Sequence, residues 1–228
     1  MVSKKIRLAG FSAREWDLLH GASGDLCVPK VRRPIKQDLA CGRCIGLMLA
    51  PPCSSWSAAR DRTYPIRSRK FIRGIPGLKA SDLAKVDLGN AALDAALDLA
   101  RAAQSAGAPW ILENPHTSKM WHDHKLKVLI ARSRAVSVVT DYCQWGKPWR
   151  KRTRFLVGNV SPEDLTKLNR VCSGRRICSR TGRPHQHLEG AGPGGIRWTL
   201  LAMPYPARLA HVLASILVSK ARSDYNIC

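Results

Sequence analysis

Two short apolar runs in the first half of the chain predict buried β-strands. Ile45 to Ala50 contains no polar side chain, and Trp110 to Leu112 forms a second apolar run. Uninterrupted runs of this kind are typical of strands covered on both faces, as in a mostly parallel sheet. Pro51 and Pro115 follow the two runs and end the strands, because proline cannot donate to the hydrogen-bond ladder.

A helical pattern connects the two predicted strands. The apolar residues at three- and four-residue spacing are Leu83, Val86, Leu93, Leu97 and Ala100. This spacing predicts a helix with one buried face. Ser81 or Asp82 is suited to cap its first turn, and Gly107 is suited to end it after about Ser105. Asn90 lies on the same stripe, either as a satisfied core amide or as a brace for the loop after the first strand.

Helices and strands alternate through most of the chain. We expect helices over Lys119 to Arg132 and Tyr205 to Ser219, and strands over Ala135 to Thr140 and Arg154 to Gly158. Such alternation is typical of a three-layer α/β fold. The composition divides the chain into a core over 1–158, a Gly- and Arg-rich Cys/His-containing insertion over 159–203, and a helical end over 204–228 that packs back on the core.

Reactive side chains follow both predicted strands. Cys53 comes after the first strand on a proline-rigidified turn, and Glu113 comes directly after the second. Ligands bind beyond the carboxyl ends of parallel strands, so a connecting helix would bring Cys53 and Glu113 to the same edge of the sheet. The simpler alternatives are a small buried cysteine in a tight turn and a helix-capping or solvated carboxylate.

These residues resemble motifs of the DNA cytosine-5 methyltransferase family. Members carry a Pro-Pro-Cys turn, matched by Pro51 to Cys53, and a Glu-Asn pair after a later strand, matched by Glu113 and Asn114. A third motif, an aromatic-Gly-x-Pro turn before a basic stretch and a strand ending in Gly, is similar to Trp145 to Gly158. The resemblance covers roughly residues 15 to 218.

One family element is not matched in the third motif. The family's usual Gln-x-Arg-x-Arg is replaced by Trp149, Lys151 and Thr153, although Arg150, Arg152 and Arg154 keep the stretch basic.

The resemblance implies a Rossmann-like methyltransferase sandwich that is incomplete at the N-terminus, and methyl transfer to carbon 5 of cytosine. Cys53 would add as a thiolate to carbon 6, because the adduct makes carbon 5 nucleophilic. Glu113 would hydrogen-bond ring nitrogen 3 and stabilise the adduct. The base must leave the helical stack to reach both groups.

The resemblance also implies S-adenosylmethionine as the cofactor. Glu15 or Asp17 would bind its ribose hydroxyls, Asp25 would accept from the adenine amino group, and Pro51 would lie against it. The family's glycine-rich turn is absent, since Gly10 is a lone glycine too close to Glu15 for an intervening helix and strand. We therefore expect a truncated or degenerate copy, or a protein whose cofactor site is completed by a partner chain.

The charge of the chain predicts a polyanionic partner. Lys and Arg number 38 against 16 Asp and Glu, a formal net charge of +22. We expect nucleic acid, DNA rather than RNA, to bind basic and aromatic side chains, with a solvated basic face as the alternative. The candidate contacts are Ser57, Arg60, Arg62, Arg69, Lys70, Asn114, Arg150, Lys151 and Arg152.

The Cys/His-containing insertion predicts a structural zinc site. Cys143, Cys172, Cys178 and His185 would satisfy tetrahedral coordination, with His187 as an alternative to His185. The insertion has few apolar residues, so a metal would supply the folding energy that its core cannot. The alternative is a set of isolated thiols.

The chain contains no apolar stretch of transmembrane length and no signal peptide, so we expect an intracellular protein without membrane partners, nuclear if eukaryotic. Three functions remain open from the sequence: a DNA cytosine-5 methyltransferase-like enzyme, an inactive nucleic-acid-binding protein of the same fold, and an RNA cytosine methyltransferase.

Overall fold

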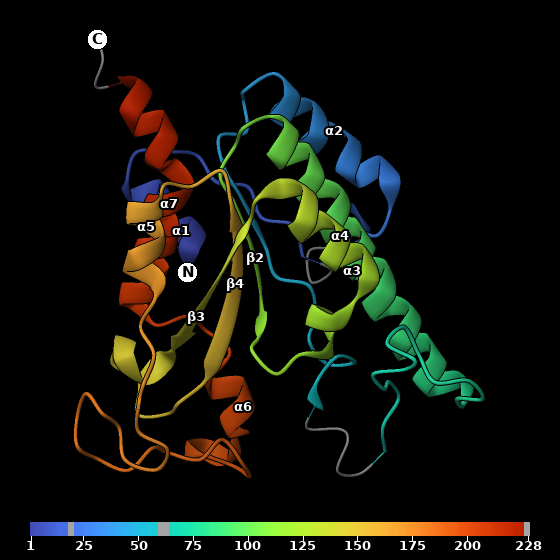
Figure 1. The fold of residues 1–228 in the computed structure, drawn as a ribbon, viewed down its shortest axis with the longest axis vertical. Helices are drawn as coiled ribbons and strands as arrows, with labels where there is room; N and C mark the ends of the chain where they lie inside the picture. Colours follow the sequence, from blue (N-terminus) through green and yellow to red (C-terminus); the bar gives the residue numbers. More distant parts are fainter. Residues whose placement is uncertain (18–20, 59–63, 226–228) are drawn as a thin grey trace.

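The structure is a computed structural model that describes residues 1–17, 21–58 and 64–225. Its described residues form three layers, with a four-stranded sheet between two groups of helices (Figure 1). One face is covered by α2 (Pro29–Ala40), α3 (Ala80–Ser105) and α4 (His124–Ser133). The other is covered by α1 (Val2–Leu8), α5 (Pro162–Leu168) and α7 (Ala207–Tyr225), and the short α6 (Trp198–Leu201) belongs to the segment 159–203. The expected α/β class is confirmed.

The sheet has the order β1-β2-β4-β3 and is mixed rather than mostly parallel. Its strands are β1 (Leu47–Leu49), β2 (Trp110–Pro115), β3 (Val136–Asp141) and β4 (Arg152–Gly158). β1 pairs with β2 in parallel, whereas β4 is antiparallel to both β2 and β3. β1, β2 and β3 therefore run in one direction, and their carboxyl ends point to the same edge.

The reversed strand β4 follows from the connection that precedes it. Residues 142–151 link β3 to β4 without a crossover helix, through the short 3-10 turn Tyr142–Trp145. A short connection of this kind joins neighbouring antiparallel strands, whereas parallel neighbours need a long crossover. The sequence pattern located both strands but could not show that β4 inserts between β2 and β3.

Strand β2 lies at the centre of the hydrophobic core. Trp110 and Leu112 pack with the α2, α3 and α4 face, and Ile111 packs with the α1 and α7 face. All three side chains are fully buried. The prediction of a strand covered on both faces is confirmed here.

Helix α3 also follows the predicted pattern over most of its length. Val86, Leu93, Leu97 and Ala100 are buried, and Gly107, with φ of +64°, follows the helix end. The prediction is wrong for Leu83, which is 47% exposed in the first turns of the helix. The N-cap position is Lys79, so Ser81 and Asp82 lie inside the helix instead of capping it.

Two further boundaries differ from those expected. The predicted helix over 119–132 is divided into a 3-10 turn, Lys119–His122, and α4, because Asp123 accepts from the Leu126 N–H at 3.2 Å and caps α4. The closing helix α7 begins after Pro206 and continues to Tyr225. None of the helices in the described ranges is long and apolar enough to cross a membrane.

Substitution of Leu97 by Ala should lower the free energy of unfolding by about 2–5 kcal/mol, because it leaves a cavity in a fully buried position. Leu83→Ala on the same helix is the matched control and should cost less than about 0.5 kcal/mol. Urea unfolding followed by circular dichroism measures both. Equal losses in the two variants would contradict the placement of the α3 stripe.

Candidate functional site

The carboxyl ends of β1 and β2 are joined by a buried amide. Asn114 Nδ2 donates to the Pro51 carbonyl at 2.9 Å, so the Cys53 turn is attached to the end of β2. Glu113 precedes this amide within β2 and opposes Phe155 of β4. The structure thus attaches both expected reactive residues to one edge, with the Cys53 side chain exposed and Glu113 buried.

Glu113 lies near polar groups from two distant parts of the chain. The Tyr205 hydroxyl donates to Glu113 Oε2 at 3.1 Å. Burial raises the pKa of Glu113, although the Lys151 ammonium and this hydrogen bond oppose the rise. The environment therefore favours the protonated carboxylic acid more than water does, which suits an acid that donates to a substrate.

Lys151 is the group at this edge that the sequence did not place in the reactive site. Its Nζ donates to the Ala202 carbonyl at 3.1 Å and lies 5.0 Å from the Tyr142 ring centroid. Burial lowers the pKa of Lys151, whereas Glu113 and Cys53 raise it. Strand alternation could have predicted that Lys151 faces Glu113. Residue 151, just before β4, lies on the same face as residues 153 and 155, and Phe155 is the register partner of Glu113.

The Cys53 thiol is protonated more readily than a free thiol. Although its side chain reaches solvent, the surrounding protein partly desolvates it and raises its pKa, and the Glu113 carboxylate raises it further. Lys151 has the opposite effect. Cys53, Glu113 and Lys151 thus form one electrostatically coupled group.

The turn that carries Cys53 is held by buried Arg67. Its guanidinium lies 3.4 Å from the Trp56 ring centroid and is fully enclosed. It donates to the carbonyl oxygens of Ser55, Ile72 and Val86 at 3.0, 2.8 and 2.9 Å, to the Ser55 hydroxyl at 3.1 Å and to Asn90 Oδ1 at 2.8 Å. Burial lowers the pKa of Arg67 to about 10. Arg67 is therefore a positioning residue. The sequence did not predict this role, because Arg67 stands in a basic stretch with Arg69, Lys70 and Arg73.

Two residues of α3 complete the support for this turn. Asn90 accepts from Arg67 and donates from Nδ2 to the Arg73 carbonyl at 2.9 Å, so it is a satisfied amide that also braces the loop. Gly89 accepts from Trp56 Nε1 at 3.3 Å, and a Cβ there would collide with the Ser55 hydroxyl. A glycine is required at this contact because the turn packs directly on the helix backbone.

The expected nucleic-acid contacts divide into two groups in the structure. Arg69 and Lys70 are exposed near the exposed ring of Phe71, and Ser57 is half-buried on the Cys53 turn. Arg60 and Arg62 lie outside the described residues.

The remaining cations are held by protein groups. Arg152 donates to both Asp141 oxygens at 2.9 and 2.7 Å, and Arg150 Nε lies 3.4 Å from Asp141 Oδ2. Lys151 lies between them in sequence and interacts with Glu113. Arg150, Lys151 and Arg152 thus interact with carboxyl groups of the protein itself. The local sequence, which is simply basic, did not indicate these partners.

Cys143, Cys172, Cys178 and His185 come together as a candidate metal centre. Their ligand atoms all lie within 4.8 Å of one another, and the three cysteines are buried. The His185 Nδ1 lies 3.3 Å from the Arg175 carbonyl, which leaves Nε2, 3.6 Å from Cys172 Sγ, for a metal. The group could bind a metal ion, and His185 rather than His187 completes it.

The protonation of this centre suits a thiolate ligand. Burial opposes ionisation of Cys172, but hydrogen bonds from the Ser179 hydroxyl and backbone N–H lower its pKa to about 6. Burial raises the pKa of the neighbouring Cys143 to about 12, so this thiol would lose its proton on metal binding.

The three acidic residues expected at the cofactor lie in the segment between α1 and α2. In the described part of this segment no strand precedes them. Arg7 donates to Glu15 at 3.1 Å, Asp25 accepts from the Cys27 N–H at 2.8 Å, and Asp17 also has interaction partners. Pro51 is buried, and its carbonyl accepts from Asn114. This arrangement does not fit S-adenosylmethionine, because no strand precedes the three carboxylates among the described residues and they are therefore not presented beyond strand ends.

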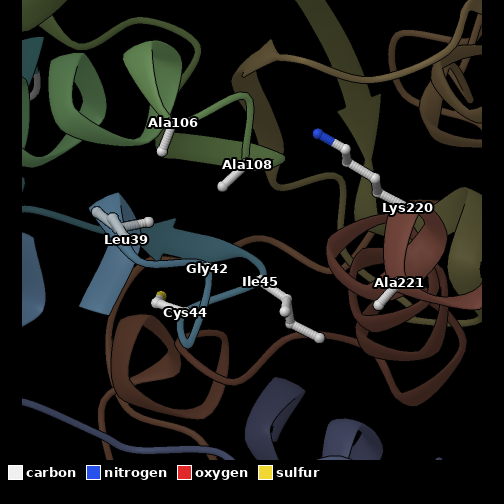
Figure 2. A pocket seen from close by; sticks show the side chains of 8 residues that line it. All are labelled: Leu39, Gly42, Cys44, Ile45, Ala106, Ala108, Lys220 and Ala221. Atoms are coloured by element: carbon white, nitrogen blue, oxygen red, sulfur yellow. The ribbon is translucent and has the colours of Figure 1, made fainter. Parts of the chain in front are cut away.

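A cavity of about 180 Å³ lies at the opposite edge of the sheet. Figure 2 shows Cys44, Ile45 and Ala108, which precede β1 and β2, together with Lys220 of α7 on its wall. It is therefore separate from the Cys53 edge.

The chain is a mixed α/β protein with a thiol, a buried carboxyl group and a lysine at one sheet edge. Neither a protein-family model, nor a curated protein, nor a solved structure matches it.

Replacement of Glu113 by Gln should lower the pKa of Cys53 and increase its alkylation rate at neutral pH, because a neighbouring negative charge is removed. Lys151→Met should raise the pKa and slow alkylation. The pH profile of iodoacetamide incorporation at Cys53, determined by mass spectrometry, measures both. Shifts in the same direction would contradict the coupling of the three groups.

Protein purified without chelator should contain about one equivalent of zinc, because three thiols and one imidazole within 4.8 Å of one another are a ligand set used by structural zinc sites. Cys178→Ser should lose most of the metal and lower the melting temperature, whereas Cys41→Ser, at an exposed thiol outside the group, should change neither. Elemental analysis and thermal unfolding provide the measurements. Less than about half an equivalent in the unmodified chain would reject the zinc site.

Proposed function

We propose that this chain is a cytosine-5 methyltransferase-like protein that acts on nucleic acid, DNA in the first instance. The observation that supports this most is the coupling of Cys53, Glu113 and Lys151 at the edge where Asn114 joins the ends of β1 and β2. A nucleophile, an acid and a cation around one accessible thiol suit addition to an electron-poor ring.

The proposed step is addition of Cys53 to a cytosine base. The thiol proton leaves to solvent, and the Lys151 ammonium stabilises the thiolate. A bond forms between Sγ and ring carbon 6, and the electron pair of the 5,6 double bond moves to the bond between carbons 4 and 5. The electron pair of the double bond between carbon 4 and nitrogen 3 moves to nitrogen 3. Ring nitrogen 3 takes the proton from Glu113, whose raised pKa gives it a larger fraction of protonated acid than a free carboxyl group has.

A cation-rich surface supports a polyanionic substrate. The net charge of +22 attracts nucleic acid without regard to sequence, and exposed Arg69 and Lys70 beside Phe71 combine charge with a stacking surface. Removal of a base from its stack is required for Cys53 to reach the ring.

Addition to the base is the step that this chain's own residues support. Glu15, Asp17 and Asp25 do not fit the methyl donor S-adenosylmethionine, so methyl transfer would require a donor site completed by a partner chain. The same observation favours a second candidate, an inactive nucleic-acid-binding protein of the same fold.

We assign zinc to the Cys143, Cys172, Cys178 and His185 group as a structural ion. Three thiolates and an imidazole fill a tetrahedron and leave no open position for substrate. The ion would stabilise the insertion 159–203, which supplies three of the four ligands.

Incubation with a single-stranded oligonucleotide containing pyrimidin-2-one in place of cytosine should give a covalent complex without any added donor, because this base accepts a thiol readily. Cys53→Ser should abolish the complex, and Cys41→Ser should retain it. Denaturing electrophoresis and peptide mass spectrometry measure the product for DNA and RNA versions in parallel.

Noncovalent binding that persists without any Cys53 adduct would favour the inactive nucleic-acid-binding protein. An adduct with the RNA version alone would replace DNA by RNA as the substrate. A separate incubation of 5-fluorocytosine DNA with S-adenosylmethionine tests methyl transfer itself.

A further inference from the structure

A second group of polar side chains lies on the other face of the sheet at the same edge. Arg154 of β4 is the register partner of Asn114, so the two side chains project to the same side, opposite to Glu113. Asn114 in turn donates to Pro51 of the Cys53 turn. The Arg154 guanidinium is therefore a near neighbour of the proposed reactive edge.

Arg154 has an unused hydrogen-bond donor. Its Nε is buried and has no hydrogen-bond partner among the described residues. Its Nη2 lies 3.4 Å from His116 Nδ1, and its guanidinium carbon lies 5.1 Å from the Trp121 ring centroid. A buried donor without an acceptor is costly, so a bound acceptor would relieve an unfavourable arrangement.

The residues around Arg154 are fixed by the ends of β2 and the Cys53 turn. The His116 N–H donates to the Arg152 carbonyl at 3.1 Å, and Trp121 Nε1 donates to the Pro115 carbonyl at 2.8 Å. The Lys119 N–H donates to the Trp56 carbonyl at 2.9 Å, which attaches the turn Lys119–His122 to the Cys53 loop. The group is thus preorganised rather than assembled from free surface chains.

The local charge around this group is positive. Burial lowers the pKa of His116, and Arg154 and Arg152 lower it further, with Asp141 as the opposing carboxylate. Burial also lowers the pKa of His122, with additional effects from Arg69, Lys127 and Arg154. Asp141 is already paired with Arg150 and Arg152, so little negative charge remains to balance these cations.

We propose that Arg154 and His116 form a binding site for a phosphate group. Arg154 would donate from its buried Nε, and the His116 imidazole would donate when protonated. We assign this site to a backbone phosphate of the nucleic acid, next to the base that reacts with Cys53. This assignment rests on the proposed function. A free phosphate has the same chemistry, and the experiment distinguishes the two sources.

Inorganic phosphate is the first probe, used with the full chain at constant ionic strength and with chloride as the reference. The imidazole C–H signals of His116, assigned with His116→Gln, are followed by NMR through a pH titration. Phosphate should raise the pKa of His116, because a bound anion favours its protonated form.

Arg154→Gln should lower phosphate affinity about tenfold or more and remove the response of His116. The matched control is Lys30→Gln with Arg33→Gln, which removes two cations from the exposed face of α2 and should leave the response unchanged. Identical histidine titrations in phosphate and chloride for the unmodified chain would overturn the site, without reliance on any variant. A full response in folded Arg154→Gln would overturn it as well.

The second probe is the pyrimidin-2-one oligonucleotide with one neutral methylphosphonate linkage beside the reactive base. In the unmodified chain this linkage should slow adduct formation about tenfold, and in Arg154→Gln it should have little further effect. A phosphate response without this difference would overturn the backbone assignment. A phosphate response in a chain that forms no Cys53 adduct would reject the proposed function and retain the phosphate site.

Discussion

The geometry of the reactive edge depends on one buried cation, Arg67. Its guanidinium is enclosed between the Trp56 ring and the backbone of α3, and its hydrogen bonds go to three carbonyls, a hydroxyl and an amide rather than to a carboxylate. A charge removed from water is tolerated only where its donors are satisfied, so the loop has to close around it in one arrangement. The Cys53 turn is fixed as a consequence, and Gly89 permits the close contact with α3.

A buried carboxylate has the corresponding role at β3, the strand at the opposite end of the sheet from β1. Asp141 accepts from Arg150, Arg152 and the Cys172 N–H, the last at 2.8 Å. It therefore ties the start of β4 to the candidate metal centre. Lys151 lies between the two arginines in sequence, so the same contacts hold the lysine toward Glu113. The metal centre and the reactive edge are thus parts of one connected structure, which gives the insertion a role beyond its own stability.

Much of the fold followed from local pattern. The apolar runs located β1 and β2, the helical stripe located α3, and alternation located β3 and β4, because each depends on neighbours a few residues away. The candidate site was predictable in part for the same reason. Cys53 and Glu113 follow predictable strands, and the thiols at Cys143, Cys172 and Cys178 are rare enough to suggest a common ligand.

The sequence by itself determined the α/β class, the positions of the four strands and of helices α3, α4 and α7, the excess of positive charge and the residue types that can carry chemistry. Only the tertiary structure decided which cations face inward. Arg67 and Lys151 belong to basic stretches whose local sequence predicts nucleic-acid contacts. In the structure Arg67 is enclosed by backbone carbonyls, and Lys151 interacts with Glu113. The tertiary structure also decided that β4 is inserted in reverse between β2 and β3. The physical reason is that secondary structure is encoded by short-range periodicity, whereas the partner of a long charged side chain is set by which distant segments the fold brings within hydrogen-bonding distance.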